Sequence, residues 1–162
     1  MSLNGQIARE DDSADWSSKE DGQAFVSTAK RVGVIIIGRR TYDIIKKAGK
    51  QIPDILTIVL TRNPALVSES PNTIITTDSL REVLGMLEKK GHKEVLIGGG
   101  SMMNASFITE NLIDEIQITV EPMVLGRGIP LFFPESFERR LRLLETKKLN
   151  ESTIQLHYEV VK

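Results

Sequence analysis

The chain has 162 residues, of which 40% are hydrophobic and 27% are charged, and its formal net charge is −1. This composition is typical of one globular domain, and it carries no surplus of positive charge for nucleic acid or an anionic membrane. The absence of cysteine excludes disulfides, thiol nucleophiles and the cysteine zinc site of nucleobase deaminases, and it fits a cytoplasmic protein. No apolar run reaches the roughly 18 residues of a membrane span, so we expect no membrane partner.

The first two thirds of the chain alternate between apolar strands and amphipathic helices. Nearly continuous β-branched and aliphatic runs predict buried strands over residues 33–38, 55–60, 73–76 and 94–98. Helical spacing of apolar residues predicts helices over 17–31 and 78–90, the second capped by Asp78 or Ser79 and ended by Gly91. This alternation favours an α/β domain with a largely parallel sheet.

The last third of the chain changes to alternating strands. Residues 115–120, 142–149 and 153–160 alternate between apolar and polar side chains, and 150–152 form a turn between the last two strands. Such strands join a sheet in antiparallel fashion. We therefore expect a mixed, mostly parallel central sheet with a C-terminal antiparallel hairpin and helices on both faces.

Three strand ends are candidates for binding phosphate groups. They lie in the segments VIIIGRRTY (34–42), LTRNP (60–64) and VLIGGGSMM (95–103). Ligands of open α/β sheets bind beyond the carboxyl ends of the strands, and a helix N-terminus there favours an anion. Glycines allow close approach to the backbone, and arginines add charge and bidentate hydrogen bonds.

Neither glycine segment matches a standard nucleotide fingerprint. Met103 stands where G-x-G-x-x-G has its third glycine, and no G-K-[ST] follows, which excludes a P-loop. Alone, the glycine run could be a structural turn, and the arginine pair could be a solvated surface pair. Together, the three segments predict a ligand with several phosphates, such as a dinucleotide with an additional 2′-phosphate.

The segment DWSSKED places an acid near the only tryptophan. Ser17 and Glu20 have the spacing of a capping box, with Ser17 as the N-cap. Asp21 would then lie at the fourth helical position, near Trp16 and one turn before Phe25 on the buried side of the helix. Two aromatic neighbours would desolvate the carboxylate, as suits a proton donor. The alternative is that Asp21 only complements the helix dipole.

The two histidines do not predict a metal site. His92 falls in a turn, and His157 falls in the last strand. A zinc site needs three or four ligands, and no third ligand accompanies this pair, so we predict that no metal is bound.

The order of these motifs resembles that of the dihydrofolate reductase superfamily, especially the C-terminal reductase domain of riboflavin-biosynthesis deaminase–reductases. The matching segments cover nearly the whole chain: SLNGQIA (2–8), DWSSKED (15–21), VIIIGRRTY (34–42), LTRNP (60–64), VLIGGGSMM (95–103), LIDEIQITVEPMVLGRGIPLF (112–132) and the closing hairpin. The long block at 112–132 points to the riboflavin-type branch. The resemblance implies one domain over residues 1–162 with the three-layer α/β fold of dihydrofolate reductases.

The resemblance also implies NADPH as the cofactor and assigns residues to it. The implied cofactor-binding residues are Gly38, Arg39, Arg40 and Thr41 for one phosphate region, Thr61 and Arg62 for the 2′-phosphate, and Gly98, Gly99, Gly100 and Ser101 for the pyrophosphate and nicotinamide. Asp21 would be the catalytic acid. The implied substrate-binding residues are Asn4, Gly5, Trp16, Phe25 and Tyr42.

Several segments depart from the family pattern. The family has a central apolar strand immediately before the segment S-L-D-G. Here only Met1 precedes Ser2, so we expect either that the chain start was trimmed or that another segment or subunit fills the place of this strand. Asn4 replaces the acid of S-L-D-G. The segment YDIIKKAGK (42–50) replaces D-x-P-x-L, and Met103 replaces a common aromatic residue.

The implied activity is the NADPH-dependent reduction of a small heterocyclic substrate. The first candidate is the riboflavin-pathway reduction of 5-amino-6-(5-phosphoribosylamino)uracil or of 2,5-diamino-6-ribosylaminopyrimidinone phosphate, with Asp21 or a bound water supplying the proton. The alternative substrate is dihydrofolate or another pteridine. A rival of another class is a non-catalytic nucleotide-binding module. The riboflavin-type branch also implies a homodimer formed through a sheet edge.

Overall fold

The computed structural model describes residues 1–49, 55–68 and 70–162. Contacts divide the chain into two compact units. Unit 1 comprises Met1–Ala24 and Asn104–Lys162, and unit 2 comprises Phe25–Met103. Within the described residues, no helix is long and apolar enough to cross a membrane.

Unit 2 contains the predicted parallel sheet. Its strands are β2 (Val34–Gly38), β3 (Leu56–Leu60), β4 (Thr73–Thr76) and β5 (Leu96–Ile97), in the order β4-β3-β2-β5. Every neighbouring pair in this sheet is parallel. The four predicted strands are confirmed, although β5 is shorter than the apolar run that predicted it.

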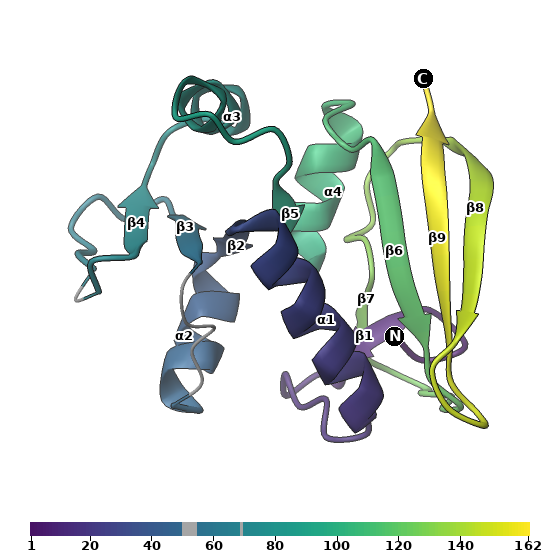
Figure 1. The fold of residues 1–162 in the computed structure, drawn as a ribbon. Helices are drawn as coiled ribbons and strands as arrows, with labels where there is room; N and C mark the ends of the chain where they lie inside the picture. The colour runs from purple at the N-terminus through teal and green to yellow at the C-terminus, as the bar shows by residue number, and fades with distance from the viewer. Residues whose placement is uncertain (50–54, 69) are drawn as a thin grey trace. The chain divides into compact units, whose positions relative to one another are not determined.

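Helices cover both sides of this sheet. They are α1 (Lys19–Val32), α2 (Arg39–Lys47) and α3 (Leu80–Lys89), and Figure 1 shows α2 and α3 on opposite sides. The strands β2 and β3 contribute to a buried cluster that includes Ala29 of α1, and Tyr42 and Ile45 of α2 pack against this cluster. Ser79 caps α3 through a capping box with Glu82, which decides between the two predicted caps.

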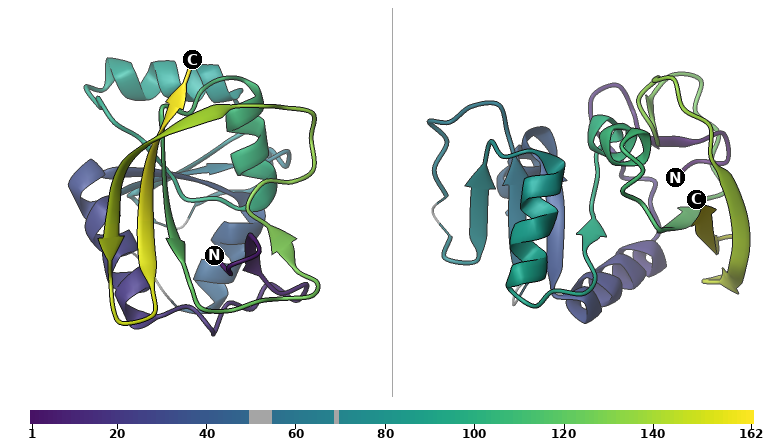
Figure 2. Two further views of the ribbon diagram at one scale, coloured as in Figure 1. Left: turned by 90° about the vertical axis from the view of Figure 1, so that its right-hand side faces the viewer. Right: turned by 90° about the horizontal axis from the view of Figure 1, so that it is seen from above.

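Unit 1 contains the antiparallel strands. They are β6 (Glu115–Val120), β8 (Arg140–Lys148) and β9 (Ile154–Val161), in the order β6-β9-β8, with β1 (Gln6–Ala8) pairing separately with β7 (Ile129–Pro130). The left view of Figure 2 shows β8 at the edge of the three-stranded sheet. The predicted hairpin turn is confirmed, because Asn150 Oδ1 accepts hydrogen bonds from the N–H groups of Ser152 and Thr153, each at 2.9 Å.

The α/β class is as predicted, but the sheet arrangement differs in one respect. Within the described residues, the parallel and antiparallel strands form separate sheets. Met1 and Ser2 pair with the end of β6, where Ser2 makes one parallel bridge to Glu121. A single bridge is too short to serve as the central strand of one mixed sheet.

The helix α4 (Ser101–Thr109) follows β5, and its end is held by an arginine. The Nη2 atom of Arg139 donates to the carbonyls of Ile108 and Thr109, at 3.2 and 3.4 Å. A cation on the last carbonyls of a helix satisfies acceptors that lack intrahelical partners and complements the dipole.

Candidate functional site

The three predicted phosphate loops meet at one edge of the parallel sheet of unit 2. They begin where β2, β3 and β5 end, and β2 lies between the other two strands. Because the strands are parallel, their carboxyl ends share one edge, which is where open α/β sheets bind ligands. The structure thus brings these loops together, as the sequence predicted.

In the loop between β5 and α4, Gly98 and Gly99 allow the backbone to pack closely against β2. A Cβ atom at Gly98 would lie 2.6 Å from Ile35 Cδ1 and 2.9 Å from Ile37 Cγ2, closer than real contacts allow. Gly99 has a φ of +87°, which favours glycine. The N–H of Gly38 donates to the Gly99 carbonyl at 3.1 Å and so joins two of the predicted loops. Gly98 is therefore required by packing, and its contact with a ligand stays a prediction.

The start of α4 carries a buried hydroxyl without a partner. Ser101 is 7% exposed, and its Oγ atom makes no hydrogen bond in the described structure. A buried unsatisfied hydroxyl costs about 1–3 kcal/mol, and helix N-terminal N–H groups favour anions. Beside it, a Cβ atom at Gly100 would lie 3.5 Å from Thr41 Oγ1, so little space separates these loops. A phosphate oxygen is a suitable acceptor for the Ser101 hydroxyl.

The arginines of these loops differ in their partners. The Nε of Arg39 donates to both carboxylate oxygens of Asp43, each at 2.8 Å, which neutralises part of its charge. Arg40 is exposed and also engaged. Sequence reasoning missed Asp43, although an Arg–Asp pair four residues apart in a helix is a recognisable signal.

Arg62 stands on an ordered turn at the end of β3. Thr61 Oγ1 accepts from the N–H of Asn63 at 3.1 Å, and Asn63 Oδ1 accepts from the N–H of Ala65 at 3.0 Å. The Arg62 side chain is exposed, and no hydrogen bond or ion pair to another described residue engages it. It is therefore available for an anionic ligand.

The first turn of α1 in unit 1 differs from the sequence prediction by one residue. The helix begins at Lys19, and the N–H of Asp21 donates to Ser18 Oγ at 3.2 Å, so Ser18 is the N-cap. The predicted capping box of Ser17 with Glu20 is wrong. Ser17 Oγ instead donates to Asp21 Oδ2 at 2.6 Å. Asp21 thus lies at the third helical position, where it is half-buried.

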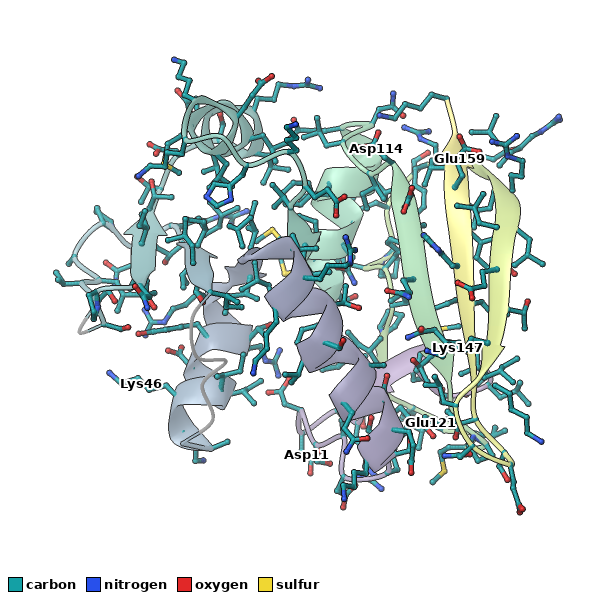
Figure 3. All side chains as sticks on the ribbon, in the orientation of Figure 1. Asp11, Lys46, Asp114, Glu121, Lys147 and Glu159 are labelled. Carbon is teal, nitrogen blue, oxygen red and sulfur yellow. The ribbon has the colours of Figure 1, made fainter. Side chains whose placement is uncertain are left out.

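The carboxylate of Glu121, the residue after β6, explains this shift; Figure 3 labels its side chain. Glu121 is 2% exposed, and its Oε1 atom accepts from the N–H and Oγ of Ser18, at 2.9 and 2.7 Å. Thr153 Oγ1 donates to Oε2 at 3.0 Å. Burial alone would raise the pKa of Glu121, but the hydrogen bonds from Ser18 and Thr153, together with the charge of the N-terminal ammonium group, outweigh burial and lower it. Sequence reasoning missed Glu121, because no local pattern links residues 103 positions apart.

A second contact holds the same turn of α1. Asn150 Nδ2 donates to Glu20 Oε2 at 3.2 Å. The predicted capping box would have Glu20 bond with Ser17. Instead, Glu20 contacts the turn between β8 and β9. Two segments of unit 1 thus fix the start of α1.

The predicted substrate residues of unit 1 have mixed surroundings. Asn4 uses its side-chain amide on the backbone of Leu125, donating to its carbonyl at 2.6 Å and accepting from its N–H at 3.1 Å. Gly5 has a φ of +85°, which favours glycine. Trp16 is half-buried, and its Nε1 atom has no hydrogen-bond partner in the described structure. Asn4 is thus occupied by the loop after β6, whereas Trp16 retains an unused donor.

The two predicted substrate residues of unit 2 also differ. Phe25 was expected on the buried side of the helix, but it is 40% exposed. Tyr42 packs against the core formed by α1 and the parallel strands. Its ring therefore has a packing role, and its contact with a substrate stays a prediction.

Neither histidine belongs to a metal-binding cluster. Among the described residues, no group of three or more His, Cys, Asp or Glu side chains could hold a metal ion. His157 Nε2 lies 2.7 Å from Glu115 Oε2 on the neighbouring strand β6. This pair bridges two strands of the antiparallel sheet.

Comparison with known proteins gives a consistent result. The family model described as the RibD C-terminal domain matches residues 1–155. Bacillus subtilis YwjB is 35% identical, with 98% of this chain and 92% of YwjB covered. The 2,5-diamino-6-ribosylamino-4(3H)-pyrimidinone 5′-phosphate reductase of Archaeoglobus fulgidus is 32% identical over 44% of this chain and 34% of its own length. The crystal structure of a riboflavin biosynthesis protein from Shewanella sp. PV-4 superposes with a TM-score of 0.88 and 26% identity, covering 100% of this chain and 96% of that chain.

Proposed function

Because the chain belongs to the RibD C-terminal domain family, a family of reductases, we propose that it is an NADPH-dependent reductase of a phosphoribosylaminopyrimidine. The observation that carries this proposal is the family match over nearly the whole chain. The Archaeoglobus fulgidus relative acts, by its name, on 2,5-diamino-6-ribosylamino-4(3H)-pyrimidinone 5′-phosphate, which supports this substrate class.

Two features of the unit 2 loops support NADPH as the cofactor. The unpartnered Ser101 hydroxyl at the start of α4 would donate to a pyrophosphate oxygen. Arg62, on its ordered turn, would bind the 2′-phosphate, which distinguishes NADPH from NADH. When bound, the cofactor supplies a hydride.

Asp21 is the acid that we propose for the proton transfer. Its Oδ2 atom accepts from Ser17, which fixes the carboxyl group on the first turn of α1. Reduction of an open-chain sugar imine adds a hydride to carbon and a proton to nitrogen. Asp21, directly or through a water that it holds, would provide this proton.

The decisive experiment measures cofactor binding first and turnover second. Trp16 is the only tryptophan, so its emission can follow a titration with NADPH. We expect saturable binding, and then NADPH oxidation with the phosphoribosylaminopyrimidine and not with dihydrofolate. Absence of NADPH binding would contradict the cofactor assignment. Oxidation with dihydrofolate alone would move the substrate to the pteridines, and binding without any oxidation would favour a nucleotide-binding module.

Substitution of Asp21 separates its proposed role from a structural one. Asp21→Asn should lower turnover by about 10²–10⁴-fold, the usual contribution of a general acid, and leave NADPH affinity nearly unchanged. Glu20→Gln is the matched control, because its amide oxygen can still accept from Asn150. Equal losses of turnover and NADPH affinity in Asp21→Asn would show that Asp21 only stabilises the helix.

A further inference from the structure

The first turn of α1 is held by a carboxylate that is remote in sequence and almost fully buried. Glu121 is 2% exposed and receives hydrogen bonds from Ser18 N, Ser18 Oγ and Thr153 Oγ1, at 2.9, 2.7 and 3.0 Å. A buried carboxylate is costly unless such donors surround it. Its burial also means that Glu121 itself is shielded from any ligand in solution.

The hydrogen-bond directions connect Glu121 to Asp21. Ser18 has one hydroxyl proton, and it points to Glu121 Oε1. The same hydroxyl oxygen must therefore be the acceptor for the N–H of Asp21, at 3.2 Å. Donation to a carboxylate polarises a hydroxyl and strengthens it as an acceptor. Glu121 thus fixes Ser18, and Ser18 fixes the backbone of Asp21.

The side chain of Asp21 depends on the same turn. Ser17 donates to Asp21 Oδ2 at 2.6 Å, and Ser17 precedes the residue that Glu121 holds by its backbone N–H. Movement of Ser18 would displace both the backbone and the hydroxyl that orient the Asp21 carboxyl group.

We propose that Glu121 is a positioning residue for Asp21: it locks the N-cap of α1 through Ser18 so that the Asp21 carboxyl group is held in one place for proton transfer. This inference rests on the proposed reductase function, in which Asp21 is the acid. No local sequence pattern assigns this role to Glu121.

The activity test compares three variants with the wild-type chain. Glu121→Ala should lower kcat by about 10–100-fold, because small displacements of a reacting group have effects of this size. The dissociation constant for NADPH should stay unchanged, since neither Ser18 nor Thr153, to which Glu121 bonds, is among the residues proposed to bind it. Glu121→Gln should retain most of kcat, because its amide oxygen can accept from Ser18 and its amide N–H can donate to Thr153.

Ser18→Ala tests the connection itself and remains informative if Glu121→Ala does not fold. It should lower kcat as Glu121→Ala does, and the double variant should lose little more than either single variant, because both remove the same link. Fully additive losses would overturn the inference. So would an unchanged kcat in folded Glu121→Ala or Ser18→Ala.

A spectroscopic measurement tests the same link without substrate. Trp16 lies two residues before Ser18, so Glu121→Ala should increase quenching of Trp16 emission by acrylamide and speed amide exchange at Asp21. Glu82→Ala is the matched control: Glu82 also accepts from the N–H and Oγ of a helix N-cap serine, Ser79, but at α3. It should change neither measurement nor kcat.

These measurements separate this inference from the proposed function. If the wild type binds no NADPH, the proposed function fails, and Trp16 quenching with Asp21 exchange still decides whether Glu121 holds this turn. If the wild type turns over and Glu121→Ala changes neither Trp16 nor Asp21, the positioning role is overturned while the reductase function stands.

Discussion

At the scale of single residues, the arginines of the candidate cofactor site show how partners decide availability. Arg39 and Arg62 both follow strands of the parallel sheet, and both were predicted to bind phosphate. The Nε of Arg39 donates to the Asp43 carboxylate, whereas Arg62 makes no hydrogen bond or ion pair with another described residue. We therefore propose that Arg62, rather than Arg39, binds the 2′-phosphate that distinguishes NADPH from NADH.

Arg62→Ala should lower the affinity for NADPH by about tenfold or more and leave the affinity for NADH almost unchanged, because a hydrogen bond to a charged group contributes about 1.5–3 kcal/mol. Fluorescence titration of both nucleotides measures the ratio. Arg31→Ala is the control, since Arg31 is an exposed arginine of unit 2 that pairs with Glu94. An unchanged NADPH-to-NADH ratio in Arg62→Ala would contradict the assignment.

Glu121 makes the stability of the protein depend on acid pH. Its pKa is lowered in the folded state, because the effect of burial is outweighed by hydrogen bonds from Ser18 and Thr153 together with the charge of the N-terminal ammonium group. Its ionised form therefore stabilises the fold fully above the ordinary glutamate pKa of about 4.3, and this contribution is lost as pH falls through the lower folded value.

Urea unfolding of the wild type and Glu121→Gln over a range of pH should show this dependence. The difference in free energy of unfolding should be largest near neutral pH and should shrink below about pH 4. Both proteins keep the other carboxylates, so the difference between them reports on Glu121. A difference that does not vary with pH would contradict the expected ionised state.

At the scale of elements, the β5–α4 junction depends on close packing against β2. The space that a side chain at Gly98 would need is filled by Ile35 and Ile37. The loop also bonds to β2 through the N–H of Gly98, which donates to the Ile36 carbonyl at 2.9 Å. The position of the glycine loop, and of Ser101 after it, is thus set by β2.

Gly98→Ala should destabilise the protein by about 1–3 kcal/mol, the usual cost of overpacking, and should weaken NADPH binding. Gly85→Ala provides a control of opposite sign. Gly85 lies within α3, and a Cβ atom there would have no neighbour within 4 Å, so alanine should stabilise the helix by about 0.5–1 kcal/mol. Thermal or urea unfolding measures both. Equal effects of the two substitutions would contradict the packing role of Gly98.

At the scale of the whole molecule, the edge strand β8 is the surface where we propose that two copies pair. All nine of its residues are exposed, and its leucines Leu141, Leu143 and Leu144 are 44%, 53% and 46% exposed. An edge strand offers unpaired backbone groups, and exposed leucines add apolar area that a second copy could bury.

Sedimentation velocity should show a dimer, and Leu143→Glu should convert it to a monomer, because a charge on the pairing strand would be buried without a partner. Val67→Glu is the control, since Val67 is 79% exposed but lies outside the sheets. A monomeric wild type, or a Leu143→Glu protein that remains dimeric, would contradict pairing through β8.

Local patterns were sufficient to predict most elements and the three loops at one edge of the parallel sheet. The apolar run 34–38 predicts β2, and the Asn150 turn predicts the final hairpin, because periodicity and turn chemistry act over a few residues. The meeting of the three candidate loops also follows from sequence, since parallel strands bring their carboxyl ends to one edge. These features require no knowledge of distant contacts.

Only the tertiary structure decided the start of α1 and the surroundings of the candidate acid. By sequence, Ser17 and Ser18 are both suitable N-caps, and Ser17 has the better local pattern with Glu20. Ser18 is the N-cap because Glu121, 103 residues away, accepts both of its donors in a buried position. The N-cap preferences of Ser17 and Ser18 differ by less than the free energy of the hydrogen bonds that a buried carboxylate needs. The contact with the distant Glu121 therefore determined where the helix begins.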